Sequence, residues 1–326
     1  MTTGAAAAHG RPHDDFVLPF NTVKSGMTGR IVRLGAVVDT ILSRHDHPEP
    51  VSELLGQAVA LTAMLGVSLK FDGALTVQAS TNGPVGMFVV GYETPGRLRA
   101  YALFDADRVA ATRAEGGSAA TGLLGTGHLA LTIDPGARMD RYQGVVALEH
   151  GGLAEAAHTY FRQSEQLPTF VRLAVARHRV STETGWQWRA GGLIVQHVSP
   201  VGGKPPVEDE AGNILMGEDD DHWQRVAMLS STVEDHELLD PTLSSERLLY
   251  RLFHEEGVRV SPPLPLEVFC RCSRDRVASF LKTFEGDDIS NLRDADGNVT
   301  VTCEFCNTAY RFEPPGSGPV GAAGRK

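Results

Sequence analysis

Four cysteines form the most distinctive chemical pattern in the sequence. They occur as two close pairs, Cys270-Arg-Cys272 and Cys303-Glu-Phe-Cys306, with thirty residues between the pairs. Four thiolates supplied as two short pairs suit a tetrahedral zinc site, because zinc has no geometric preference from its d-electrons and each pair can approach one ion. We therefore predict that Cys270, Cys272, Cys303 and Cys306 bind one Zn²⁺ per chain.

The residues around the cysteines predict the elements that would position them. Ser273 can cap a helix from Asp275 to Phe284, and Asp296-Gly297 can turn the chain into a strand, Val299–Thr302, that leads to Cys303. A module of this size buries too little apolar area to fold alone. Zinc binding to such peptides contributes about 10–16 kcal/mol near neutral pH, so we expect metal removal to unfold the module.

Basic residues beside the cysteines favour the thiolate, which is the nucleophilic form of the side chain. Arg271, Arg274, Arg276 and Lys282 lie close to the first pair in sequence. An oxidant that takes two electrons from each thiol pair would release zinc and unfold the module together. Charged neighbours also argue against four free cysteines in an apolar core. An inert structural zinc site is the alternative that spacing alone leaves open.

Composition narrows the class of protein. The chain has 326 residues, 30 Lys and Arg against 40 Asp and Glu, and a formal charge of −10, which argues against general binding to nucleic acid or to an anionic membrane. Four clustered cysteines are too few for a disulfide scaffold. Residues 1–15 lack the features of a signal peptide, and the apolar stretch Leu54–Leu69 fits a buried helix better than a membrane span, so we expect a cytoplasmic protein.

Strand and helix patterns alternate irregularly, which predicts an α+β fold. Apolar residues at helical spacing predict one helix over Ile31–Leu42 and a second helix capped by Ser52. A meander of strands is expected to follow between Leu75 and Phe104. The expected organisation comprises a disordered tail (1–15), an N-terminal sheet-and-helix domain (16–198), an acidic loop (199–221), a helical linker (222–266), the zinc-binding module (267–313) and a second disordered tail (314–326).

The linker contains an amphipathic helix directly upstream of the cysteine module. Over Ser245–Glu256 its apolar face consists of Leu248, Leu249, Leu252 and Phe253. A stripe of this kind packs into a core or serves as a latent binding surface. We predict that it binds unfolded proteins once oxidation of the adjacent module exposes it.

The chain resembles the redox-regulated 33-kDa heat-shock chaperone family (heat shock protein 33) from about Phe16 to Phe312. The paired cysteines are the most specific part of the resemblance. The matching blocks, in chain order, are Leu69–Gly73, Arg141–Val146, Ser164–Thr169, Ala190–Gly192, Leu252–Glu256, Cys270-Arg-Cys272-Ser273-Arg274 and Cys303–Cys306.

The resemblance implies an ATP-independent holdase and not an enzyme. In that family the reduced protein binds one zinc through four cysteines and is inactive. Peroxide or hypochlorous acid, together with unfolding stress, releases the zinc and forms two disulfides, which by position would be Cys270–Cys272 and Cys303–Cys306. The linker then loses structure and exposes apolar surface to unfolding client proteins, and the active form is a homodimer.

Rival functions receive less support. A zinc-ribbon nucleic-acid binder would conflict with the acidic charge, and a catalytic zinc needs an open position that four thiolates close. Gly203-Lys204 is followed by Pro205 and does not form an ATP-binding loop. His45-Asp46-His47 is expected to be a turn. The remaining polar cluster, to which no chemistry is assigned, consists of Arg162, Ser164 and Glu165.

Overall fold

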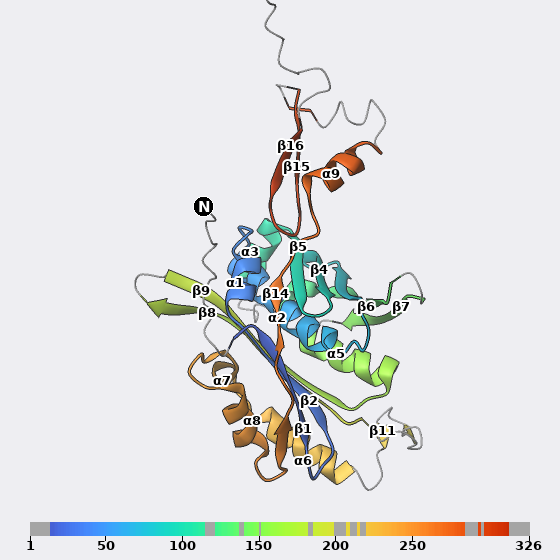
Figure 1. The fold of residues 1–326 in the computed structure, drawn as a ribbon, viewed down its shortest axis with the longest axis vertical. Helices are drawn as coiled ribbons and strands as arrows, with labels where there is room; N and C mark the ends of the chain where they lie inside the picture. Colours follow the sequence, from blue (N-terminus) through green and yellow to red (C-terminus); the bar gives the residue numbers. More distant parts are fainter. Residues whose placement is uncertain are drawn as a thin grey trace, which may run out of the picture. The chain divides into compact units, whose positions relative to one another are not determined.

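The computed structural model divides the chain into two compact units, Met1–Phe269 and Cys270–Lys326 (Figure 1). It describes residues 14–114, 121–136, 140–149, 151–181, 185–198, 207–208, 214–215, 220–283, 293–294 and 297–312. The first unit combines two large sheets with helices, so the α+β fold is confirmed, and the four cysteines lie in the second unit.

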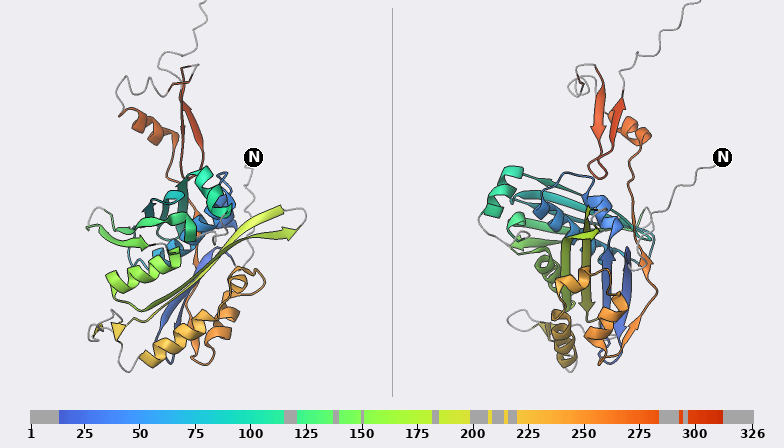
Figure 2. Two further views of the ribbon diagram at one scale, coloured as in Figure 1. Left: turned by 180° about the vertical axis from the view of Figure 1, so that it is seen from behind. Right: turned by 90° about the vertical axis from the view of Figure 1, so that its left-hand side faces the viewer.

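The first sheet of unit 1 is antiparallel, with the strand order β12-β1-β2-β9-β8, and β13 also pairs with β1. The long β8–β9 hairpin forms one side of this sheet (Figure 2). The strands are β1 (Phe16–Thr22), β2 (Thr28–Leu34), β8 (Thr169–Ser181), β9 (Gly185–Gln196), β12 (Val258–Val260) and β13 (Leu264–Pro265).

The second sheet has the order β14-β5-β4-β3-β6-β7. Its strands pair antiparallel except for β14, which runs parallel to β5. The predicted meander therefore forms its centre. The strands are β3 (Ala74–Thr81), β4 (Val85–Glu93), β5 (Arg97–Phe104), β6 (Thr126–Asp134), β7 (Tyr142–Glu149) and β14 (Glu267–Val268).

One helix fills the space between the two sheets. Nearly every side chain of α2 (Glu49–Gly66) is buried, and the helix packs against strands of both sheets. It begins at Glu49, ahead of the predicted cap Ser52, because proline is tolerated in a first turn whose N–H groups have no helical partner. The other helices of this part of the chain are α1 (Ala36–Leu42), α3 (Ala106–Ala114), α4 (Thr121–Leu124) and α5 (Leu153–Tyr160), which continues as a π-helix (Phe161–Glu165).

Three helices cover the opposite face of the first sheet. These are α6 (Asp220–Ser231), α7 (Asp235–Leu239) and α8 (Ser245–Phe253) (Figure 1). α7 packs on β8 and β9, and the apolar side chains of α8 share a core with those of β1, β2 and β9. The chain then continues through β12, β13 and β14 to the cysteines. The predicted acidic loop 199–221 contains two short paired strands, β10 (Val207–Glu208) and β11 (Ile214–Leu215), and the start of α6.

The helix predicted over Ile31–Leu42 is wrong in its first part. Residues Thr28–Leu34 form β2, and only Ala36–Leu42 is helical. β2 lies between β1 and β9 and is covered on both faces, so Ile31, Val32, Arg33 and Leu34 form a continuous run of buried residues. Such a run lacks the alternation that marks a strand with one solvated face.

Unit 2 contains a short helix and a hairpin. Helix α9 (Arg274–Leu281) is capped by Ser273, whose Oγ accepts a hydrogen bond from the Arg276 backbone N–H at 3.2 Å. Strands β15 (Val299–Thr302) and β16 (Ala309–Phe312) pair antiparallel. α9 has no buried side chain among its residues, so apolar packing of this helix contributes little to the stability of the unit.

Candidate metal centre

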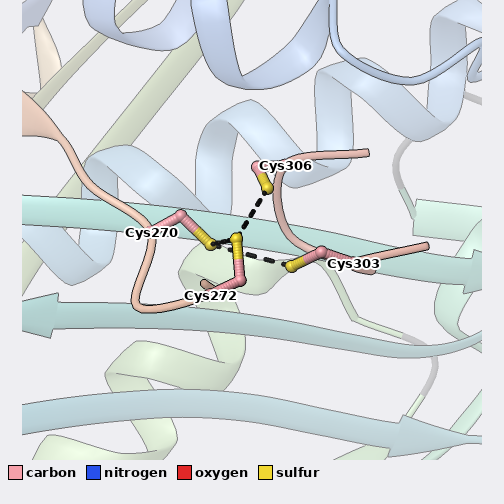
Figure 3. A group of neighbouring side chains, drawn as sticks. All are labelled: Cys270, Cys272, Cys303 and Cys306. Atoms are coloured by element: carbon pink, nitrogen blue, oxygen red, sulfur yellow. Dashed lines mark hydrogen bonds between the residues drawn. The ribbon is translucent and has the colours of Figure 1, made fainter. Parts of the chain in front are cut away.

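The four cysteine sulfurs converge on one point (Figure 3). The Sγ atoms of Cys270 and Cys272 are 3.3 Å apart, those of Cys270 and Cys303 are 3.7 Å apart, and those of Cys272 and Cys306 are 3.2 Å apart. All four lie within 4.8 Å of one another, and none forms a disulfide. The four cysteines are therefore close enough to bind one metal ion.

The sulfur spacing fits a tetrahedral ion better than it fits covalent pairing. A zinc–sulfur bond of about 2.3 Å places tetrahedral thiolates about 3.8 Å apart, whereas a disulfide needs about 2.05 Å. The observed 3.2–3.7 Å lies close to the tetrahedral value. No other His, Cys, Asp or Glu joins this group within the part of the chain that the structure describes.

Local backbone structure positions each cysteine pair. Cys270 and Cys272 lie between β14 and the capped start of α9, and the other pair lies in the β15–β16 turn. In that turn the Asn307 N–H donates to the Cys303 carbonyl at 2.8 Å, and the Cys303 N–H donates to the Thr308 carbonyl at 3.0 Å. Asn307 has φ 55°, a left-handed conformation that asparagine tolerates and that reverses the chain after the second pair.

The thiols differ in acidity. Burial raises the pKa of Cys270 to about 12. Burial also raises the pKa of Cys306, but hydrogen bonds with Thr308 and Cys272 outweigh this effect and lower it to about 6. The Cys306 Sγ lies 3.2 Å from the Thr308 hydroxyl, and the Tyr310 hydroxyl donates to the Cys272 Sγ at 3.2 Å. Neither Thr308 nor Tyr310 could be identified from sequence, because an isolated threonine or tyrosine in a strand region carries no signal.

Two of the arginines near the first cysteine pair contact groups other than the cysteine sulfurs. The Arg274 guanidinium lies 4.6 Å from the centre of the Phe312 ring, and Arg276 donates to the Arg271 carbonyl at 3.0 Å. The lowered pKa of Cys306 comes from its hydrogen bonds and not from these cations. Charge patterns in sequence indicate proximity along the chain but not the direction in which long side chains extend.

The apolar residues predicted to bind clients are all buried in this structure. Leu248, Leu249, Leu252 and Phe253 are at most 3% exposed. The Phe253 ring stacks on Phe20 of β1 with 5.6 Å between the ring centres. Their apolar neighbours include Leu18, Ile31, Leu193 and Val195 on the first sheet and Met27 in the β1–β2 connection. The helix and the sheet thus cover each other's apolar surface.

The other sequence motifs do not form a second metal site in the described residues. His45 and His47 stack with 4.9 Å between ring centres in the connection between α1 and α2. Glu165 accepts hydrogen bonds from the hydroxyls of Tyr160 at 2.9 Å and Tyr142 at 3.5 Å. Of the three residues expected to form a polar cluster, Arg162, Ser164 and Glu165, it is Glu165 that bonds these two tyrosine hydroxyls. Gly203-Lys204 lies outside the described residues. In the described part of the chain no helix is both long and apolar enough to span a membrane.

Comparisons with known proteins place this architecture in one family. The family model for "Hsp33 protein" matches residues 15–313. The chain is 46% identical over 306 residues to the 33 kDa chaperonin of Caulobacter vibrioides (strain NA1000 / CB15N), covering 93% of this chain and 96% of that protein. It is 36% identical over 287 residues to the 33 kDa chaperonin of Photorhabdus laumondii, covering 87% and 88%.

A solved structure shares the fold. The crystal structure of the 33 kDa chaperonin (heat shock protein 33 homolog) from Thermotoga maritima superposes with a TM-score of 0.70 at 21% identity, covering 92% of this chain and 95% of that one. The family match, the relatives and the fold agree over nearly the whole chain. The chain therefore belongs to the Hsp33 family of 33-kDa chaperonins.

Proposed function

We propose that this protein is a redox-regulated, ATP-independent holdase that binds unfolding proteins and prevents their aggregation under oxidative and heat stress. The observation that carries the proposal is the position of the cysteine cluster. Cys270 follows Val268 of β14 by two residues, and the covered linker helices α6–α8 lie directly upstream. The cysteine module is thus joined through a short strand to helices whose apolar surface is buried in the resting protein. Unfolding of the module can therefore loosen the chain that holds this surface in place.

The resting state holds one Zn²⁺ on Cys270, Cys272, Cys303 and Cys306. Four thiolates close the coordination shell, so the ion has a structural role and activates no water. Two molecules of peroxide oxidise the site. Each peroxide takes two electrons from one thiolate pair, takes up two protons and becomes two water molecules. The two sulfurs of that pair form one disulfide. The expected pairs are Cys270–Cys272 and Cys303–Cys306, and zinc leaves because a disulfide sulfur is a poor ligand.

Zinc loss removes the main stabilising contribution to unit 2. The adjoining chain is then held by short strands, by the burial of Leu266 and by an ion pair of 3.1 Å between Glu267 and Arg97. The Glu267 N–H donates to Gly96 at 2.9 Å and the Phe269 N–H donates to Leu98 at 2.9 Å. Release of this segment and of the helices upstream exposes both α8 and the sheet face beneath it. Exposed apolar surface of this kind is where unfolded clients bind and where a second oxidised copy associates as a homodimer.

The cytoplasm is the expected location, because reduced thiols are needed for the zinc-bound resting state. Neither nucleotide, nucleic acid nor membrane takes part in the proposed activity. Client binding by exposed apolar surface needs no ATP, since the affinity comes from removing that surface from water.

The test measures zinc release, thiol loss and suppression of client aggregation in the same samples, with peroxide at raised temperature and without ATP. We expect the three to rise together in the wild-type protein. A variant with all four cysteines replaced by serine is the matched control, because it lacks both the metal site and the thiols. Zinc that stays bound, or suppression that does not depend on oxidant, would refute the switch and leave a structural zinc protein. Retention of labelled nucleic acid on a filter at moderate salt would favour the zinc-ribbon alternative.

A further inference from the structure

Two buried arginines lie on neighbouring strands beneath α7. Arg33 of β2 is 1% exposed and Arg189 of β9 is 6% exposed. Arg33 donates through Nη1 to the Asp240 carbonyl and through Nη2 to the Glu237 carbonyl, the latter at 2.7 Å. Arg189 donates through Nε to the Leu239 carbonyl at 2.8 Å. Two guanidinium groups thus hold three backbone carbonyls at the C-terminal end of one linker helix.

An aspartate at the start of the described part of the chain completes this cluster. Asp14 accepts two hydrogen bonds from Arg189, at 2.8 Å and 2.6 Å, and both side chains of the pair are less than 10% exposed. The next residue, Asp15, accepts backbone N–H groups of Gly35 and Val37 at 2.9 Å and 3.0 Å. Both aspartates fall within the range that the sequence predicted to be a disordered tail, so the structure extends the folded domain to residue 14.

A glycine in β9 allows α7 to approach the sheet closely. Gly191 lies opposite Arg33 in the β2–β9 pairing. A Cβ atom at Gly191 would lie 2.6 Å from the Leu238 carbonyl oxygen, which is closer than atoms can approach without a shift. Glycine at this position therefore lets the backbone of α7 come near enough for the arginines to reach its carbonyls.

The energetics of this cluster depend on whether α7 is docked on the sheet. The carbonyls of Glu237 and Asp240 are the hydrogen-bond acceptors of Arg33, whose Nε has no partner in the structure. With α7 lifted, water reaches two adjacent positive charges that repel each other and gain hydration. Removing a donor while the helix is docked leaves buried carbonyls unpaired instead. These hydrogen bonds therefore stabilise docked α7 only while its carbonyls keep their arginine donors.

We propose that Arg33, Arg189 and Asp14 form a clamp that holds α7, and with it the linker helices, on the first sheet in the resting protein. The clamp sets how much oxidant is needed before the linker is released. This inference rests on the proposed function for its regulatory meaning, while the clamp itself is a statement about docking of α7 that can be tested separately.

The test uses variants that weaken the clamp without touching the cysteines. Arg33→Met keeps the aliphatic stem and removes the donors, and Asp14→Asn removes the charge that neutralises Arg189. The matched control is Arg172→Gln. Arg172 forms an ion pair of 2.8 Å with Asp235 at the first residue of the same helix, but both side chains are about half exposed, so little coupling is expected.

Amide hydrogen exchange is measured on the reduced, zinc-loaded proteins. We expect residues 235–253 to exchange at least about tenfold faster in both variants than in the wild type. Arg33→Met removes the donors of two charge-assisted hydrogen bonds to α7. Asp14→Asn leaves Arg189 without its counter-charge beside Arg33, so the two guanidinium groups repel each other more strongly while α7 is docked. Strands β3 and β4 in the other sheet should exchange at the wild-type rate, and zinc should remain bound. The peroxide concentration at half-maximal activation should fall in both variants and stay unchanged in Arg172→Gln.

Three results would overturn the clamp. The first is wild-type exchange over residues 235–253 in both variants. The second is an equal acceleration in β3 and β4, which would indicate general destabilisation. The third is an unchanged peroxide midpoint despite faster local exchange. If Arg33→Met does not fold, Asp14→Asn alone decides. A wild-type protein that peroxide does not activate would instead refute the proposed function, and the exchange comparison would still decide whether the clamp exists.

Discussion

Replacing Phe253 by alanine should release the linker from the resting protein. The side chain is fully buried and stacks on Phe20 with 5.6 Å between ring centres. Truncation of a buried phenylalanine costs about 3–5 kcal/mol, which includes the cavity left behind. The cost falls on the docked state alone, because the ring of the released helix is in water. Since about 1.4 kcal/mol is a factor of ten, the population of released linker should rise roughly a hundredfold or more.

The assay is binding of an apolar fluorescent dye to reduced, zinc-loaded protein, with hydrogen exchange over α8 measured in parallel. Tyr250→Ala is the matched control, because Tyr250 lies on the same helix, is also aromatic, and is 65% exposed. We expect strong dye binding by Phe253→Ala before any oxidation and wild-type behaviour from the control. Equal dye binding and equal exchange in the two variants would refute the reasoning that α8 is held by its buried face.

Three further outcomes follow from the structure. Removing the metal with a chelator should unfold unit 2, a loss of about 10–16 kcal/mol of binding free energy, and near-ultraviolet circular dichroism that does not change would contradict this. Gly191→Ala should destabilise docking of α7 by about 1–3 kcal/mol, because the added Cβ would clash with Leu238. Gly86→Ala, where a Cβ meets nothing closer than 4.0 Å, should have little effect. Urea unfolding curves that coincide for the two variants would contradict this prediction. Burial and the neighbouring His45 lower the pKa of His47 to about 4. The unfolded chain, with a histidine pKa near 6.5, therefore binds a proton between pH 6.5 and 4 that the folded chain does not, so stability is complete above pH 6.5 and falls as the pH drops to 4. After allowance for partial exposure the loss is about 1 kcal/mol at pH 5. In His47→Gln this part of the pH dependence should disappear, and urea titrations with equal pH slopes in both proteins would argue against it.

The cluster of four cysteines was predictable from the sequence because its geometry is mostly local. A C-x-C pair and a C-x-x-C pair each lie on one tight segment, so spacing alone limits where the sulfurs can point. The cap of α9 by Ser273 was predicted for the same reason, since the accepted N–H is only three residues away. The acidity of Cys306 was not predictable, because it depends on Thr308 and on a cysteine from the other pair.

The sequence by itself determined the paired cysteines that could bind one metal ion, the meander and the amphipathic character of α8, all of which depend on residues near one another along the chain. Only the tertiary structure decided what α8 covers, that Thr28–Leu34 is a strand, and that Arg33 is buried. Arg33 meets the Asp240 carbonyl across 207 positions of sequence. An arginine in isolation is most often solvated, and a strand covered on both faces shows no alternation. Such contacts depend on which elements pack together in the fold, and the local sequence pattern does not show which elements those are.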